Sequence, residues 1–137
     1  MTAPDRARRG LTRLMAGAGV ATGAALLAQP RRIADAVAPE FPRERLWLVR
    51  LLGARLVAQH GAVLTAPSAG LVRIGSAVDL VHAASMVPFV ASPRYGRAAR
   101  ISGALAAAYA AVARWAALGS AGLLLLLPTA LLLAPAL

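Results

Sequence analysis

Long apolar stretches, each ended by prolines, glycines or arginines, are the feature that most constrains this chain. Three of them, 46–66, 69–91 and 98–118, come close to the ~20 residues that cross a bilayer as a helix. A fourth, 123–137, is shorter. Membrane strands are only about 9–11 residues long and alternate in polarity, which these stretches do not. The pattern predicts an all-α fold, a small helical transmembrane bundle of about three to five helices.

Residues 1–45 form a basic segment ahead of this transmembrane domain at 46–137. We expect a weakly apolar helix over 11–28, then a Pro- and Arg-rich linker at 29–45 with a short surface helix over 31–37. The first helix fits a span, a surface helix or a processed signal. Arg8-Arg9-Gly10-Leu11-Thr12-Arg13 resembles a twin-arginine export signal, and Ala34-Asp35-Ala36 is a small-x-small cleavage pattern. Export is the less favoured reading, because it leaves the arginines of the linker outside.

Charge is distributed unevenly along the chain. The net charge is +10, every basic residue is an arginine, and Asp79 is the only acidic residue after Glu44. On insertion scales an arginine at the centre of a span costs about 2.5–3.5 kcal/mol. Arg50 and Arg73 are near the ends of their stretches, where a long side chain reaches the interface. Arg55 is too deep for that, so it needs a partner.

The partner follows from counting outward from the turn at 67–68. Arg55 lies about 12 residues before this turn and Asp79 about 12 after it, so each is roughly 18 Å from the turn at 1.5 Å per helical residue. Two opposite charges at one depth on adjacent helices predict an Arg55–Asp79 ion pair.

The same count predicts a polar seam inside the bundle, with Gln59 near Gly75 and Ser76 and His82 near Gly53. The favoured interpretation is structural, with the ion pair fixing the register of the helices. The alternative is a polar pathway or proton relay. For His82, the favoured interpretation is a neutral, hydrogen-bonded ring, and the alternative is a ring that titrates near neutral pH beside Asp79. The members of this seam are Arg55, Gln59, Asp79 and His82.

Most enzyme classes are excluded by the scarcity of reactive residues. We expect no metal site, because His60 and His82 differ by roughly 10 Å in depth and do not converge. Paired carboxylates cannot occur past Glu44, and the chain has neither a G-x-S-x-G motif nor a phosphate-binding glycine loop. Nucleic acid is not an expected partner, because the arginines flank apolar runs and aromatic residues are few. We therefore predict no catalytic residues and no cofactor.

Two further patterns concern topology and packing. The positive-inside rule assigns Arg43, Arg45 and Arg50 on one connection, and Arg94, Arg97 and Arg100 on the other, to the cytoplasmic side. The turn at 66–69 then faces outward. Small residues at every fourth position predict a close helix contact, within the chain or between copies of it. They are Ala99, Gly103, Ala107 and Ala111.

The region from Leu52 to Met86 resembles a group of small multi-helix bacterial membrane proteins. The residues that carry the resemblance are Leu52-Gly53-Ala54-Arg55, Gln59, Arg73-Ile74-Gly75, Asp79 and His82-Ala83-Ala84-Ser85-Met86. The resemblance covers about a quarter of the chain. It implies a multi-helix membrane protein and no assigned reaction.

Taken together, these patterns predict a multi-pass protein of the cell membrane without enzymatic activity, a component or subunit held by a buried Arg55–Asp79 pair. The alternatives are a proton-linked carrier or transporter subunit that uses the polar seam, and a membrane enzyme acting on a lipid-like substrate. The expected partners are the lipid bilayer and either a second copy of the chain or another membrane protein.

Overall fold

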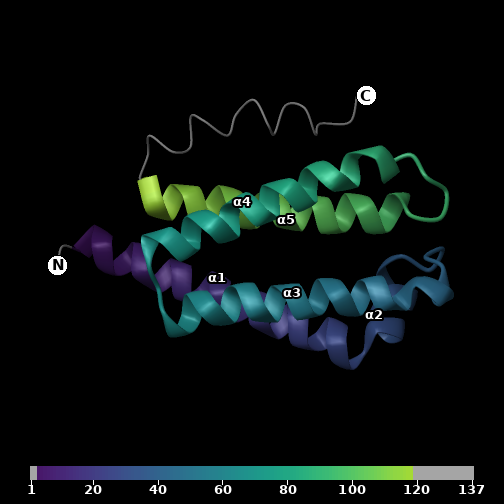
Figure 1. Ribbon diagram of the computed structural model, residues 1–137, viewed down its shortest axis with the longest axis horizontal. Helices are drawn as coiled ribbons and strands as arrows, with labels where there is room; N and C mark the ends of the chain where they lie inside the picture. The colour runs from purple at the N-terminus through teal and green to yellow at the C-terminus, as the bar shows by residue number, and fades with distance from the viewer. Residues whose placement is uncertain (1–2, 119–137) are drawn as a thin grey trace.

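The computed structural model describes residues 3–118, with side chains over 6–115, and this part of the chain is all-helical (Figure 1). The predicted all-α fold class is thus confirmed for the described residues, which contain no strand. The expected apolar segment at 123–137 lies outside them. The helices are α1 (Ala3–Ala28), α2 (Pro30–Val37), α3 (Leu46–Thr65), α4 (Ala69–Met86) and α5 (Gly96–Leu118), with 3-10 turns at Arg43–Arg45 and Val87–Phe89.

Local sequence signals set the ends of these helices. Pro30 occupies the first turn of α2, where its missing N–H is no loss. At the start of α4, the Ser68 hydroxyl accepts a hydrogen bond from the backbone N–H of Leu71 at 3.2 Å, which caps the helix. Pro88 lies in the 3-10 turn that follows Met86, because a proline cannot continue the α-helical hydrogen bonds. The linker therefore holds a short helix, and the turn at 66–68 separates α3 from α4.

The helices pair as two antiparallel hairpins, α1 with α3 and α4 with α5 (Figure 1). Helices α3 and α4 follow one another in sequence and run antiparallel, yet they approach each other at few positions. Close packing thus joins helices other than the two that flank the tight turn. Sequence had placed Gly53 opposite His82 of α4, but Gly53 faces α1 instead, where Gly23 and Leu26 are its neighbours. That prediction was wrong because α3 turns its small residue toward α1.

The contact between α4 and α5 is built from small residues. Ala99, Gly103, Ala106 and Ala110 are buried along one face of α5, and Met86 of α4 lies over Gly103. Ala107 and Ala111 are only half-buried. The predicted stripe of Ala99, Gly103, Ala107 and Ala111 was therefore half wrong. The buried positions follow spacings of 4, 3 and 4. A helix turns about 100° per residue, so residues repeated at every fourth position gradually rotate away from the contact face.

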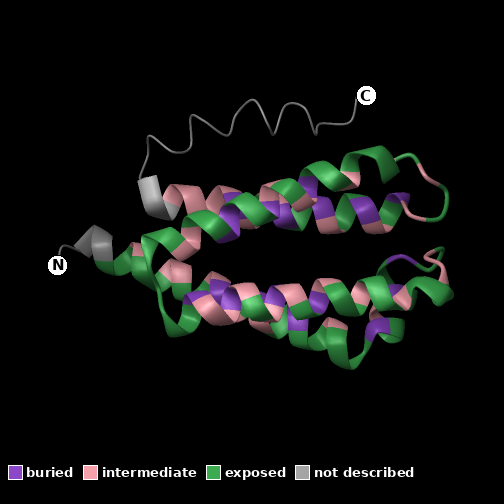
Figure 2. Cartoon of the chain, viewed as in Figure 1, coloured by how far each residue is buried: buried purple, intermediate pink, exposed green. Residues whose placement is uncertain are grey.

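Many large apolar residues are exposed, whereas most of the buried hydrophobic residues are alanines. Figure 2 shows how exposed and buried positions alternate along the helices. Val81 is 70% exposed and Ile74 63%. Such an outer surface suits a lipid environment or a protein partner.

Two of the described helices are long and apolar enough to cross a membrane, Arg6–Ala28 within α1 and Ala69–Phe89 from the start of α4 through the following 3-10 turn. Only 17% and 22% of these windows are buried, whereas the core helix of a soluble protein is mostly buried. Near the N-terminus, α1 also has the make-up of a signal sequence. The expected spans at 46–66 and 98–118 are not among these two. In α3, polar residues at 50, 55, 59 and 60 lower the mean hydropathy.

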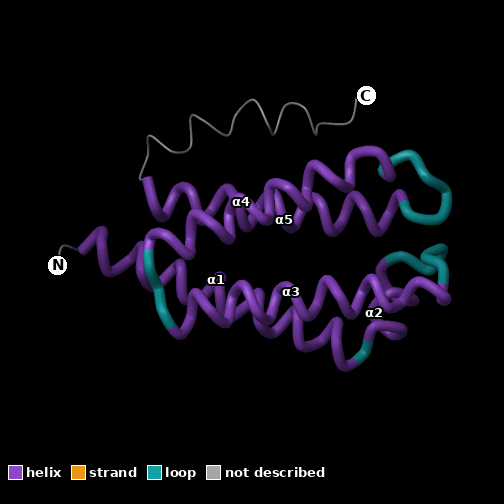
Figure 3. Tube along the Cα trace, viewed as in Figure 1, coloured by secondary structure: helices purple, strands orange, loops and turns teal. Residues whose placement is uncertain are grey.

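The two long connections lie at the same end of the molecule, opposite the α3–α4 turn (Figure 3). Phe41 of the first connection and Tyr95 of the second are in edge-to-face contact, with ring centroids 5.7 Å apart. Phe89 is also in edge-to-face contact with Tyr95, with ring centroids 6.2 Å apart. The N-terminal arginines of α1 lie at the other end (Figure 1). Positive charge is therefore found at both ends of the bundle.

Candidate functional site

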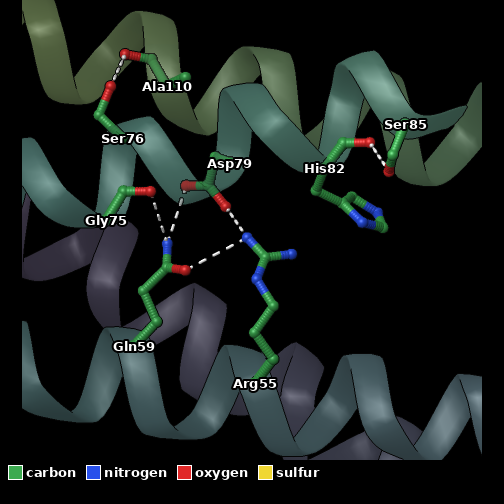
Figure 4. Close-up of polar contacts among 8 residues, drawn as sticks. All are labelled: Arg55, Gln59, Gly75, Ser76, Asp79, His82, Ser85 and Ala110. Atoms are coloured by element: carbon green, nitrogen blue, oxygen red, sulfur yellow. Dashed lines mark hydrogen bonds and ion pairs between the residues drawn. The ribbon is translucent and has the colours of Figure 1, made fainter. Parts of the chain in front are cut away.

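The candidate site lies where the middle of α3 meets the middle of α4. Arg55 and Gln59 are one helical turn apart on α3 and point toward α4, and Asp79 points back from α4 (Figure 4). Positions i and i+4 share a helix face, which is why Arg55 and Gln59 reach the same carboxylate. Three of the four seam residues named from the sequence are thus brought together.

Asp79 is held by two side chains at once. An Arg55 Nη2 hydrogen donates to Asp79 Oδ1, and Gln59 Nε2 donates to Asp79 Oδ2 at 2.9 Å. Arg55 also donates to Gln59 Oε1 at 3.2 Å, so the three groups close a ring of hydrogen bonds. Asp79 is only 3% exposed. A carboxylate this deeply buried is stable only with such partners.

Backbone contacts anchor this ring to the helices. Gln59 Nε2 also donates to the carbonyl oxygen of Gly75 at 3.3 Å, one turn before Asp79. The neighbouring Ser76 hydroxyl donates to the carbonyl oxygen of Ala110 on α5 at 3.4 Å. Gln59 does lie at Gly75, as the count from the turn predicts, whereas Ser76 turns to α5. The polar cluster therefore connects α3 to α4, and α4 to α5.

His82 does not join the hydrogen-bonded ring. Its Nε2 is buried and has no hydrogen-bond partner, and only its backbone carbonyl is engaged, accepting from Ser85 Oγ at 2.7 Å. Its ring lies on the Arg55 side of the cluster (Figure 4). Asp79 accepts hydrogen bonds from Arg55 and Gln59, and no hydrogen bond joins it to His82.

His60 is the residue that sequence reasoning missed. It is 7% exposed, and its Nε2 has no hydrogen-bond partner. Its ring lies against Gly19 of α1, where a Cβ would be 2.2 Å from the ring, and stacks at a tilt on Tyr109 of α5 at 4.8 Å. An unsatisfied buried polar group costs about 1–3 kcal/mol. The signal in the sequence was the small Gly19, which makes room for a ring on a neighbouring helix.

His60 and Asp79 line the same small cavity, which has about 40 Å³ accessible to water. Holding one water takes roughly 10–15 Å³ measured in this way, so the cavity is large enough for water and too small for an organic substrate. Helices α1, α3, α4 and α5 all contribute to its wall. The polar residues of the wall are Thr12, Gln59, His60, Ser76, Asp79 and Tyr109.

The described groups of this arrangement offer hydrogen bonds, a paired charge and a histidine ring. No three His, Asp or Glu side chains gather for a metal ion within the described part of the chain. The buried carboxylate of Asp79 is already engaged by a guanidinium and an amide. The arrangement can hold helices together, bind water and accept a proton on a histidine.

Comparison of the chain with protein-family models, with curated proteins and with solved structures finds no match.

Proposed function

We propose that this protein is a multi-pass membrane component without catalytic activity, in which the Arg55–Gln59–Asp79 cluster locks two helical hairpins together. The observation that carries the proposal is Asp79, an almost fully buried carboxylate bonded from α4 to two side chains of α3. Helices α3 and α4 otherwise approach each other at few positions. The cluster thus supplies directional contacts where packing supplies little.

The outer surface supports the location in a membrane. Small residues line the helix contacts, and the large apolar side chains face outward. Helices in lipid gain little by burying leucine or valine against each other, because lipid tails are equally apolar, so close packing of small residues holds them together. The exposed Ile74 and Val81 are then covered by lipid or by another membrane helix, either of a second copy or of a partner protein.

The lock also explains how a helix as polar as α3 enters a bilayer. A lone arginine at its centre costs about 2.5–3.5 kcal/mol, and leucine or valine each return only about 0.3–0.6. Insertion of α3 together with α4 places the Arg55 charge against Asp79 and removes most of that penalty. We propose that the two hairpins insert as one unit with all four long helices across the membrane.

The location is tested by labelling single cysteines, because the natural chain contains none. The variants are Glu40→Cys, Ser68→Cys and Arg94→Cys, all at exposed connection or cap positions. With a membrane-impermeant maleimide on intact cells and on inverted vesicles, we expect 40 and 94 to react from one side and 68 from the other. A chain that fractionates as soluble, or a label on 40 and 68 from the same side, overturns the proposal.

The lock is tested by exchanging the two charges. Arg55→Asp and Asp79→Arg should each reduce the amount of protein in the membrane, since each places two like charges face to face. The double variant should recover at least half of the loss. The matched control is Arg31→Asp with Asp35→Arg, an exposed ion pair with its closest N and O atoms 3.7 Å apart. That exchange should change little, because exposed pairs contribute about 0–1 kcal/mol.

A second candidate function is a proton-linked carrier or transporter subunit. The observation that favours it is the water-sized cavity lined by His60 and Asp79, two of the three buried polar or charged residues between 6 and 115. The charge-exchanged double variant separates the two functions, because it keeps the ion pair and moves the carboxylate to α3. A carrier loses proton flux into proteoliposomes while the variant stays folded, whereas a structural component shows no flux in either form.

A further inference from the structure

The cavity lies toward the end of the bundle that carries the α3–α4 turn. Its wall is formed by the first half of α1, the second half of α3, the first half of α4 and the second half of α5. It is thus the place where both hairpins meet. About 40 Å³ of it is accessible to water, and one water needs roughly 10–15 Å³.

His60 is a buried polar group that lacks a partner in this wall. The residue is 7% exposed, and its Nε2 atom has no protein group within hydrogen-bond reach. The ring cannot easily turn away, because it lies between Gly19 of α1 and Tyr109 of α5. Buried polar atoms in folded proteins are bonded to protein or to ordered water, so the cavity is the natural source of the missing partner.

Asp79 has acceptor capacity left for the same water. Its Oδ1 accepts from Arg55 and its Oδ2 from Gln59. A carboxylate offers about four lone-pair positions, so room remains on both oxygens. A water that donates one hydrogen to the Asp79 carboxylate and the other to His60 Nε2 gives both polar groups of the cavity wall a hydrogen-bond partner.

We infer that this cavity is a water and proton site, in which His60 is the group that binds the proton. The step is a transfer from a hydrated proton in the cavity to Nε2. It breaks one O–H bond of the hydrated proton, forms one N–H bond on the ring and leaves a neutral water in place. Nothing is oxidised or reduced, and the reverse step returns the proton to water.

Two charged groups act on His60. They are Asp79 on α4 and Arg55 on its own helix, and these two are paired with each other. Tyr109 faces the ring from α5, and α1 presents Gly19. The water site depends on the cavity and on His60, not on whether the helices cross a membrane. An experiment can therefore disprove the water site without disproving the Arg55–Gln59–Asp79 cluster as the link between the hairpins. The reverse is equally true.

The experiment uses the full chain in lipid nanodiscs with ¹⁵N-labelled histidine. The sequence has two histidines, so the variant His82→Gln leaves His60 as the only labelled ring. We expect water-edited NMR to transfer magnetisation from water to this ring, and its ¹⁵N shifts to move from imidazole toward imidazolium during an acid titration from about pH 8 down to about pH 4. A ring without a water signal overturns the water site, and a ring that keeps one protonation state across this range overturns the proton site.

A cavity-filling variant locates the water. Ala113 lines the cavity, so Ala113→Leu should remove the water signal from His60 by at least tenfold. The control Ala104→Leu makes the same change at an exposed position of the same helix and should leave the signal unchanged. An equal signal in the two variants means that the water reaching His60 is not in this cavity, which contradicts the inference. If Ala113→Leu does not fold, the single-histidine measurement decides alone.

Discussion

Gly23 of α1 and Gly53 of α3 meet backbone to backbone. A Cβ on Gly23 would lie 2.6 Å from the carbonyl oxygen of Gly53, and a Cβ on Gly53 would lie 2.7 Å from the carbonyl oxygen of Gly23. Real side chains do not come this close to backbone atoms. The pair therefore brings two helix axes nearer than any other residue type permits, and it fixes α1 as the packing partner of α3.

The first prediction concerns this contact. Gly53→Ala should destabilise the protein by about 1–3 kcal/mol, because the added methyl group pushes α1 and α3 apart. Gly61→Ala is the matched control on the same helix, where a Cβ meets nothing within 4 Å. It should raise stability by about 0.5–1 kcal/mol, the usual gain of alanine over glycine in a helix. Unfolding in mixed micelles of increasing SDS fraction measures both, and equal effects would contradict the close contact.

The second prediction tests the ion pair by neutralising it. Asp79→Leu and Arg55→Leu should each cost about 3–5 kcal/mol, because each leaves one unpaired charge inside the protein. The double variant should be more stable than either single one, since it buries no charge at all. The same unfolding measurement gives the coupling energy from the four proteins. Additive single effects would show that the two side chains do not interact.

The third prediction isolates the amide in the cluster. Gln59→Leu should cost about 1.5–3 kcal/mol, since it removes a hydrogen bond to a buried charged group. Gln29→Leu is the control, because the Gln29 side chain accepts its hydrogen bond from an exposed arginine, Arg32. That change should lie within about 0.5 kcal/mol of the natural chain. A loss at Gln59 no larger than at Gln29 would argue against its role in holding Asp79.

The fourth prediction concerns the register of α5 against α4. Ala106→Leu and Ala110→Leu should each destabilise by about 1–3 kcal/mol, because these alanines are buried against α4. Ala107→Leu and Ala111→Leu should be much milder, since those positions are only half-buried. Thermal stability in detergent distinguishes the pairs, and the opposite order would mean that α5 is rotated by one residue.

The fifth prediction is that α1 stays in the mature protein. The buried face of α3 consists of Gly53, Leu56, His60 and Val63, at spacings of 3, 4 and 3, and both Gly53 and His60 touch α1. Cleavage after Ala36 would expose this face. Intact-mass measurement of protein purified from its own membrane should therefore include residues before 34. A mature chain that begins near 37 would favour the export signal that the N-terminal arginines resemble.

Much of the candidate site was predictable because it depends on counting along helices. A turn at 66–68 and a fixed rise per residue put Arg55 and Asp79 at one depth whatever the rest of the fold does. Gln59 follows from Arg55 by one helical turn. The surroundings of His60 were not predictable in this way. His60 follows Gln59 directly, so its side chain points about 100° further around the helix, toward α1 and α5, and counting from the turn between α3 and α4 does not place those helices.

The sequence by itself determined that these segments are helical, roughly where they end, and how far each polar group lies from the turn between α3 and α4, because prolines, caps and apolar runs act locally. Only the tertiary structure decided how each helix is rotated and which helices pack. Alanine and glycine occur on every face of these helices, so apolar periodicity is too weak to predict which face packs against a neighbour. The packing face is decided by how closely the surfaces of two helices fit together. Gly23 against Gly53 selected α1 for α3, and the resulting rotation placed His60 in the cavity and left His82 outside the hydrogen-bonded cluster.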